Sequence, residues 1–340
     1  MTIVQWIEKS GAQMRVFDLG RRIEKISKSD FARIEQQAIP YPSPYLRHAW
    51  LGILTWNPKQ AGQHTIWFLK LPLDEQNQLQ PGPRDAFLRH WAQVVMAPDQ
   101  EHGEAPYSYK PDPQRMAYFH ALALQVLGQE PTRYYQTARA YLSGDLGWDN
   151  WQNLGLQGLA ETVARIAEGE STTMLATALP HLPAIPRNSL LTFLENIEVG
   201  HELSVALNDC LSHVVSAGAT EADLAAFVRA FSHSVNHAQR AALLQVILAH
   251  PHGRSLEVLA AMGSRCWQDL RGTLLQGWLE NLALNEQGQA AFNALVGELM
   301  ALPGCRDAVM SVFREPQRSE ALSRAIGALL QQVRQASTLQ

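Results

Sequence analysis

The chain has 340 residues, 46% of them hydrophobic and 18% charged, which is the composition of an ordered globular protein with room for two cores. Its net charge of −4 argues against nucleic acid as a partner, because the phosphate backbone rewards a clear basic excess. Three widely spaced cysteines suit a reducing compartment. The sequence shows neither a signal peptide nor an apolar run long enough to span a membrane, so we predict a cytoplasmic protein without membrane contact.

Three segments of the first half have the residue types and the alternation of β-strands, namely residues 13–19, 48–56 and 64–71. The second and third stand close together and predict an antiparallel hairpin. Along residues 48–56 both alternating faces are apolar, with Leu51 on one face and Leu54 on the other. Both faces of this strand are therefore expected to be covered.

The covering elements are expected to be helices. Ser29 is placed to cap a helix over residues 30–35. A proline-containing turn introduces a second helix over residues 85–96, whose apolar side chains share one stripe.

A change of composition divides the chain in two. Residues 98–113 contain four prolines and no apolar period, so we predict a linker or long loop there. Beyond it the apolar residues follow the helical period, in segments separated by glycine and proline. The predicted fold is an α+β domain with a small antiparallel sheet in residues 1–97, followed by an all-α helical-repeat, α-solenoid-like domain in residues 114–340.

One short pattern recurs four times in the second half: an arginine, two spacers and a pair of apolar residues, at the start of a helix-period stripe. The copies begin at Arg187, Arg240, Arg271 and Arg306. Recurrence at intervals of a few tens of residues is typical of stacked helical arrays. The first interval is long enough for one further helix, at residues 221–232. We expect the four arginines to lie at equivalent places near the starts of helices stacked side by side.

These arginine-headed copies resemble the second helix of HEAT-type repeats, most of all Asp269-Leu-Arg271, where an acidic residue precedes the arginine. The resemblance covers residues 170–315 and implies that the arginines form structural ladders between repeats. Taken whole, the chain also resembles an uncharacterised gammaproteobacterial family of unknown function. The features that carry this likeness are a tryptophan-rich start, residues 64–75 and the element Gly147-Trp-Asp-Asn-Trp151. The likeness implies no functional residues.

Two groups of residues are candidates for partner contacts. The first is the set of repeat arginines, Arg187, Arg240, Arg271 and Arg306. An arginine at a helix start is electrostatically unfavourable, because its charge has the same sign as the positive end of the helix dipole, unless an anion neutralises it. That anion is either a carboxylate of the next repeat or a ligand. The second group is Trp148 and Trp151, because desolvated aromatic residues dominate binding hot spots. The alternatives are structural roles, in ladders for the arginines and in packing for the tryptophans.

No pattern in the sequence is typical of catalysis, of a cofactor site or of a metal site. His233 and His237 are four residues apart and would share one face of a helix, but a third ligand and the glutamate of a zinc motif are missing. Phosphate-binding glycine loops and nucleophile elbows do not occur in the sequence either. We therefore expect no catalytic residue, no cofactor and no metal.

The predicted function is that of a non-catalytic interaction, scaffold or regulatory protein, because stacked helical repeats present a long concave surface to protein or peptide partners. Beyond residue 112 the chain carries 15 arginines and 20 acidic residues, a balance of −5, so its arginines are expected to suit an acidic partner segment. The alternative is an enzyme with a pocket between the domains that uses His48, His64 and His90. The sequence leaves the partner, the pathway and the oligomeric state open.

Overall fold

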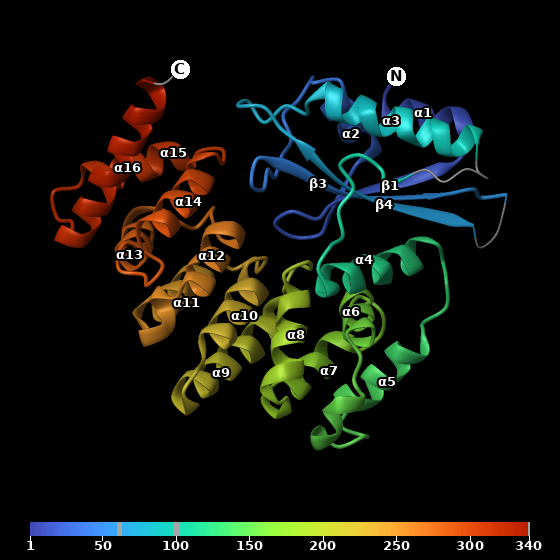
Figure 1. Cartoon of the computed structure of the whole chain (residues 1–340). Coiled ribbons are helices and arrows are strands. Elements are labelled where there is room, and N and C mark those ends of the chain that lie inside the picture. The colour runs from blue at the N-terminus through green and yellow to red at the C-terminus, as the bar shows by residue number, and fades with distance from the viewer. Residues whose placement is uncertain (60–62, 98–102, 339–340) are drawn as a thin grey trace. The chain divides into compact units, whose positions relative to one another are not determined.

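A computed structural model of the chain describes residues 1–59, 63–97 and 103–338, and of residues 336–338 it describes the backbone alone (Figure 1). The chain forms two compact units, Met1–Ala123 and Leu124–Gln340. The division falls inside helix α4 (Pro113–Val126), which follows the predicted linker. Residues 98–102 of that linker lie outside the described residues.

The first unit contains a four-stranded antiparallel sheet with the strand order β2-β1-β3-β4. Its strands are β1 (Gln13–Asp18), β2 (Glu24–Ile26), β3 (His48–Trp56) and β4 (His64–Pro72). The three predicted strands and the hairpin are confirmed, since His48 pairs with Pro72 and Trp56 pairs with His64. β2 is not predicted by the sequence, because three residues are too few to show an alternating pattern.

One face of this sheet is covered by three helices, α1 (Ile3–Ser10), α2 (Lys28–Glu35) and α3 (Pro81–Met96). Their apolar stripes bring Ile7, Phe31 and Phe87, each at most 1% exposed, into one core with Leu51 and Ile53 of β3. Full burial of each such side chain stabilises the fold by about 1.5–3 kcal/mol. This core holds the unit together.

The opposite face of the sheet is covered by α4. The Phe119 ring of this helix packs edge-on against Phe17 and Phe68, with 5.5 and 5.1 Å between ring centroids. At Gly52, in the middle of β3, a Cβ atom would lie only 2.4 Å from the Phe119 ring, so a side chain there would displace α4. The prediction that β3 is covered on both faces is confirmed.

Side chains fix where the first two helices begin. The Ser27 hydroxyl caps α2 by accepting a hydrogen bond from the Asp30 N–H at 3.0 Å. The prediction of Ser29 as the cap is wrong, because Ser27 has the extended backbone that a cap needs whereas Ser29 already lies in the first turn. The buried Glu35 carboxylate of α2 accepts hydrogen bonds from two N–H groups at the start of α1, at 2.6 and 3.0 Å, and so joins the two helices.

The described part of the predicted linker is attached to the sheet. The Lys70 N–H donates to the Tyr107 carbonyl at 2.8 Å, and the Tyr109 N–H donates to the Phe68 carbonyl at 3.1 Å. Residues 107–109 thus run along the outer edge of β4. Pairing of this kind is invisible to side-chain periodicity, because it is made by the backbone.

The named elements of the second unit are all helices. They are α5 (Arg133–Leu142), α6 (Leu156–Ala164), α7 (Ser171–Ala178), α8 (Ala184–Leu194), α9 (His201–Ala217), α10 (Glu221–Phe231), α11 (His237–Ala249), α12 (Leu256–Arg265), α13 (Gly272–Ala283), α14 (Gly288–Met300), α15 (Cys305–Arg314) and α16 (Glu320–Thr338), with short 3-10 helices η1 (Trp148–Asn153), η2 (Leu179–His181) and η3 (Pro251–Arg254). The further helix expected at residues 221–232 is confirmed as α10. The fold is therefore an α+β unit followed by a helical one.

These helices are arranged in two rows, in which a helix packs mainly against the next but one in the sequence. One row contains α6, α8, α10, α12 and α14 (green to orange-red in Figure 1), and the other contains α11, α13 and α15 (orange to red). Contacts between consecutive helices, such as α12 with α13 and α13 with α14, join the rows. Helix α10 lies between α8 and α12, and its Leu224, Phe227 and Phe231 are at most 1% exposed.

Candidate functional site

The four repeat arginines lie near helix starts, but they do not line one surface. Arg187 and Arg240 are in the first turns of α8 and α11, Arg271 is the residue before α13, and Arg306 is the second residue of α15. Three of these helices follow one another in the same row, as predicted. The expectation is wrong for Arg187, whose helix belongs to the other row, because two helices intervene between α8 and α11 whereas one intervenes between the later copies.

Arg240 is part of the interior of the helical unit. It is 4% exposed and binds Asp269 through two hydrogen bonds, from Nε at 2.5 Å and from Nη2 at 2.7 Å. Its remaining terminal nitrogen donates to the Ser234 carbonyl at 2.5 Å. A paired, desolvated guanidinium such as this connects α11 to the turn before α13 and, at 4% exposure, is not accessible to a partner.

Arg187 makes a similar pair between α8 and α10. Its Nη2 donates to the Asp223 carboxylate at 2.6 Å, and Asn188 donates to the same oxygen at 2.9 Å. The other oxygen accepts from the backbone and the hydroxyl of Thr220. Burial raises the pKa of Asp223, but these hydrogen bonds outweigh it and lower the pKa to about 2.

The last two arginines are more exposed. The Arg271 guanidinium donates to the carbonyls of Trp267 and Leu270, at 3.0 and 2.7 Å, and lies 3.7 Å from the Cys305 thiol at the start of α15. Arg306 is exposed, and no side-chain partner is found for it in the part of the chain that the structure describes. Among the repeat arginines, Arg306 is the candidate for a contact with a partner.

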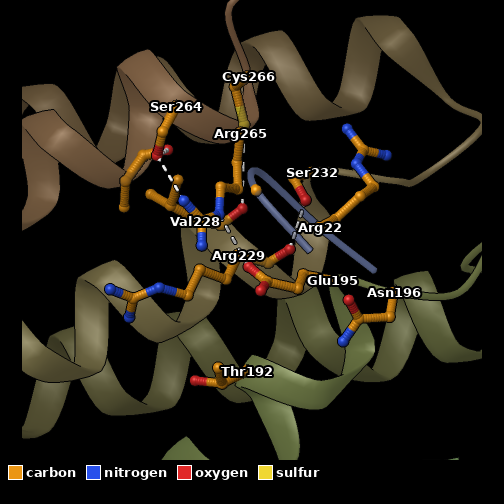
Figure 2. A network of polar contacts seen from close by, with 12 residues as sticks. Arg22, Thr192, Glu195, Asn196, Val228, Arg229, Ser232, Ser264, Arg265 and Cys266 are labelled. Atoms are coloured by element: carbon orange, nitrogen blue, oxygen red, sulfur yellow. Dashed lines mark hydrogen bonds and ion pairs between the residues drawn. The ribbon is translucent and has the colours of Figure 1, made fainter. Parts of the chain in front are cut away.

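A further buried ion pair joins the far ends of α8 and α12 (Figure 2). Arg265 Nε donates to the Glu195 carboxylate at 3.0 Å, and Nη1 of the same arginine donates to the Ser264 hydroxyl at 2.8 Å. Both charged side chains are at most 10% exposed. Together with Arg187–Asp223, this pair ties the row at both ends of α8, so the alignment of these helices depends on internal charge pairing.

Of the two predicted tryptophans, Trp148 has a packing role. Both residues lie in η1, which is separated from α6 by the extended Leu154, rather than near the start of a longer helix. The Trp148 ring stacks on His181 with 5.0 Å between ring centroids, and its carbonyl accepts a hydrogen bond from the Tyr141 hydroxyl. Trp151 is half-buried and remains a candidate for partner contact.

A groove of about 750 Å³ crosses the amino-terminal ends of α10, α12 and α14. The polar and charged residues along it include Thr220, Glu221, His252, Arg254, Glu257 and Glu286. Three carboxylates therefore face one arginine and one histidine, and the groove is acidic. Glu257 is also 3.7 Å from Arg229 of α10. Sequence reasoning missed this groove, although Thr220 and Ser255, the caps of α10 and α12, mark two of the helix starts that form it.

The histidines considered for chemistry are dispersed. His233 lies in the turn after α10 whereas His237 begins α11, so the two do not share the face of one helix that a joint metal site would need. His48 and His64 lie at opposite ends of the β3–β4 hairpin, separated by eight residues of strand or roughly 27 Å. These two cannot act on one substrate atom. The described residues contain no group of three or more His, Cys, Asp or Glu side chains that could hold a metal ion.

An α+β unit joined to a two-row helical unit is thus the class of protein that the fold defines. The chain belongs to DUF3549, a family described as "Protein of unknown function", which matches residues 1–330. Neither a curated protein nor a solved structure matches the chain significantly. Over the residues that the structure describes, no helix has both the length and the apolar character required to cross a bilayer.

Proposed function

We propose that this protein is a non-catalytic interaction protein whose helical unit binds a partner polypeptide. The observation that carries the proposal is the groove across the starts of α10, α12 and α14, because its lining comes from the starts of three helices of one row and from η3 beside them. A surface built from successive units of an array is how helical-repeat proteins bind extended segments. The two rows and the Arg187–Asp223 and Arg240–Asp269 pairs also support a HEAT-like array.

The charges on this unit favour a basic partner segment over the acidic one that the sequence suggests. Arg187 and Arg240 are neutralised by Asp223 and Asp269, so they add little positive potential at the surface. The groove instead presents Glu221, Glu257 and Glu286. Complementary charge of this kind steers association and selects partners more than it adds affinity. We propose a bacterial cytoplasm as the location, on the likeness to a bacterial family and on the three widely spaced cysteines, which suit a reducing compartment.

The test compares two pairs of carboxylates. Polypeptides captured from native extract are identified, and the affinity of the purified partner is measured for wild type and for Glu221→Gln/Glu286→Gln. Removing two of the groove's charges is expected to weaken binding at least tenfold at low salt, and by less as salt rises. The matched control is Glu198→Gln/Glu315→Gln, which neutralises two exposed carboxylates outside the groove.

Thermal melting of both double variants shows whether the fold is retained. The proposal predicts that the control binds like wild type and that both variants melt like wild type, because all four carboxylates are exposed. Equal affinity of the two variants for the partner would show that the groove is not the binding surface.

A further inference from the structure

The short 3-10 helix η3 connects the end of α11 to the start of α12 and forms part of the wall of the groove. Three of its residues, Pro251, His252 and Arg254, line the groove, and Gly253 is buried. A Cβ atom on Gly253 would lie 2.3 Å from the Ile247 carbonyl oxygen, so η3 lies directly against the last turn of α11. The position of this wall depends on how η3 is held there.

The start of η3 is capped by a histidine. His250, the residue before η3, is half-buried, and its Nδ1 accepts a hydrogen bond from the His252 N–H at 3.2 Å. Since a backbone N–H can only donate, Nδ1 carries no proton and the neutral ring holds its proton on Nε2. The His250 carbonyl accepts a second bond, from the Gly253 N–H at 2.8 Å. The side-chain cap of η3 therefore exists only while the His250 ring is neutral.

Protonation of His250 removes this cap. The imidazolium carries N–H groups on both ring nitrogens and has no acceptor. Its Nδ1–H would meet the His252 N–H donor to donor, so the ring must turn away and leave that backbone group without its partner. The loss of a side-chain cap shifts the equilibrium of a helix start about fivefold towards the open form.

The end of η3 is coupled to the start of α12. The Ser255 N–H donates to the His252 carbonyl at 3.0 Å, and the Ser255 hydroxyl caps α12 by accepting from the Val258 N–H at 3.4 Å. Glu257, one of the carboxylates of the groove, lies in the first turn of α12. Opening of η3 therefore releases Ser255 and reaches the turn that positions Glu257.

The charges around η3 leave His250 neutral in neutral solution. Burial lowers the pKa of His250 below its ordinary value, and the charge of His252, whose ring lies 5.6 Å away between centroids, lowers this pKa further. His250 therefore takes up its proton in mildly acidic solution.

Four helices pack against η3, namely α10, α11, α12 and α13. Their charged or titratable side chains are Glu221, Asp223, Arg229, His237, Arg240, Glu257, Arg265 and Glu280. Seven of these pair or hydrogen-bond with residues other than His250, and the eighth, Glu221, lines the groove. On η3 itself the charged or titratable residues are His252 and Arg254.

We propose that His250 is a proton switch for the groove: the neutral ring caps η3 and fixes this wall, and the protonated ring releases η3 and the start of α12. The switch is a property of the fold and is observable without a partner, whereas its effect on binding rests on the proposed function. In the released state a positive charge is added beside the groove's carboxylates, so a basic partner segment binds less tightly in mildly acidic solution.

The experiment follows the full chain by NMR from about pH 7.5 to about pH 4.5, a range that spans the titration of histidine. Amide exchange is expressed as protection relative to an unstructured chain, which removes the direct effect of pH on the exchange rate. Protection of the Gly253 and Ser255 N–H groups is expected to fall about fivefold, the factor that one lost cap corresponds to. The fall should have the same midpoint as the titration of the His250 ring in the same spectra.

Two variants separate the proton from the side chain. In His250→Asn the amide oxygen accepts the same hydrogen bond and does not titrate, so protection should stay at its neutral-pH value throughout. His250→Ala offers no acceptor and should show the lower protection at every pH. The matched control, His213→Asn, changes an exposed histidine of α9 outside the groove and should behave like wild type.

Thermal melts at neutral pH establish that the three variants fold. The proposal is overturned if protection of Gly253 and Ser255 is unchanged while the His250 ring titrates, or if it is already absent at about pH 7.5. It is also overturned if His250→Asn keeps the pH dependence of wild type. None of these measurements involves a partner, so failure to capture one bears on the proposed function alone.

Discussion

Each unit buries an aspartate, and the two aspartates are treated in opposite ways. In the helical unit Asp223 accepts hydrogen bonds from Arg187, Asn188 and Thr220, and these bonds lower its pKa to about 2 despite burial. In the sheet unit Asp18 accepts one backbone hydrogen bond, and burial raises its pKa to about 7. The difference shows that burial alone does not set the charge of a carboxyl group, because the bonds it accepts decide the outcome.

This contrast separates two uses of buried charge. In the helical unit the charges are paired across neighbouring helices, at Arg187–Asp223, Arg240–Asp269 and Arg265–Glu195. Such pairs are costly to break rather than strongly favourable to form, and they select one alignment of the helices. In the sheet unit Asp18 is buried beside the Tyr41 hydroxyl, which is a neutral group. The first arrangement is expected to fix the alignment of the helices, and the second is expected to make stability depend on pH near neutrality.

The largest expected effect is the loss of a paired arginine in the helical unit. Arg240→Ala leaves the 8% exposed Asp269 side chain without its bidentate partner, and should lower the free energy of unfolding by about 3–5 kcal/mol. Urea denaturation at neutral pH measures the change. Arg324→Ala, at a side chain that is 75% exposed, is the matched control and should cost less than about 0.5 kcal/mol. If both variants unfold at the same urea concentration, the buried pair has no structural role.

The second prediction concerns the pH dependence of stability that Asp18 causes. Its pKa is higher in the folded chain than the ordinary 3.8, so folding binds a proton between these values. This contribution to stability is complete below about pH 4 and is lost as the pH rises to about 7. Asp18→Asn mimics the protonated group and should be about 4 kcal/mol more stable than wild type at about pH 8.

Urea denaturation of Asp18→Asn and wild type across this pH range measures the effect. The two chains should converge in stability as the pH falls below about 4, where Asp18 becomes protonated in the unfolded state as well as in the folded one. A constant difference in stability at every pH would show that Asp18 does not titrate in this window.

A smaller effect of the opposite sign is expected from Asp223. Its pKa is lower in the folded chain, so its contribution is present above about pH 4 and is lost as the pH falls through about 2. Asp223→Asn should cost about 1–2 kcal/mol at neutral pH, a value reduced for solvent screening, because part of the charge remains near water. In acid denaturation, the free energies of unfolding of the variant and of wild type should become equal near pH 2. A difference in stability that persists at this pH would contradict the pairing of Asp223 with Arg187.

The smallest effect is expected at Arg306, the repeat arginine for which the described residues offer no partner. Arg306→Ala should change the free energy of unfolding by less than about 0.5 kcal/mol, as is usual for exposed positions. Urea denaturation of Arg306→Ala and Arg240→Ala under the same conditions compares the free energies of unfolding lost at two copies of one sequence pattern. A loss above about 1 kcal/mol would mean that Arg306 also belongs to the internal ladder.

The sequence predicts the strands of the sheet well, and it predicts the role of the repeat arginines only in part. Residues 48–56 and 64–71 were recognisable because β-branched, aromatic and apolar residues concentrate there. The turn before β3 could not be recognised from the sequence. Leu46 and Arg47 adopt left-handed φ angles of 50° and 58° there, at positions where asparagine and glycine are usual. Hydrogen bonds from Trp50 and Arg21 to the carbonyls of this turn stabilise it, and they depend on contacts across the unit.

By itself, the sequence determined the class of each half of this protein, because the period of its apolar residues must match the elements that bury them. It also determined that arginines recur at helix starts. The tertiary structure alone decided that Arg240 is buried while Arg306 is exposed, and that the pKa of Asp18 is raised while that of Asp223 is lowered. The reason is physical: burial and partner geometry are set by residues far apart in the chain, and a local pattern carries no information about them.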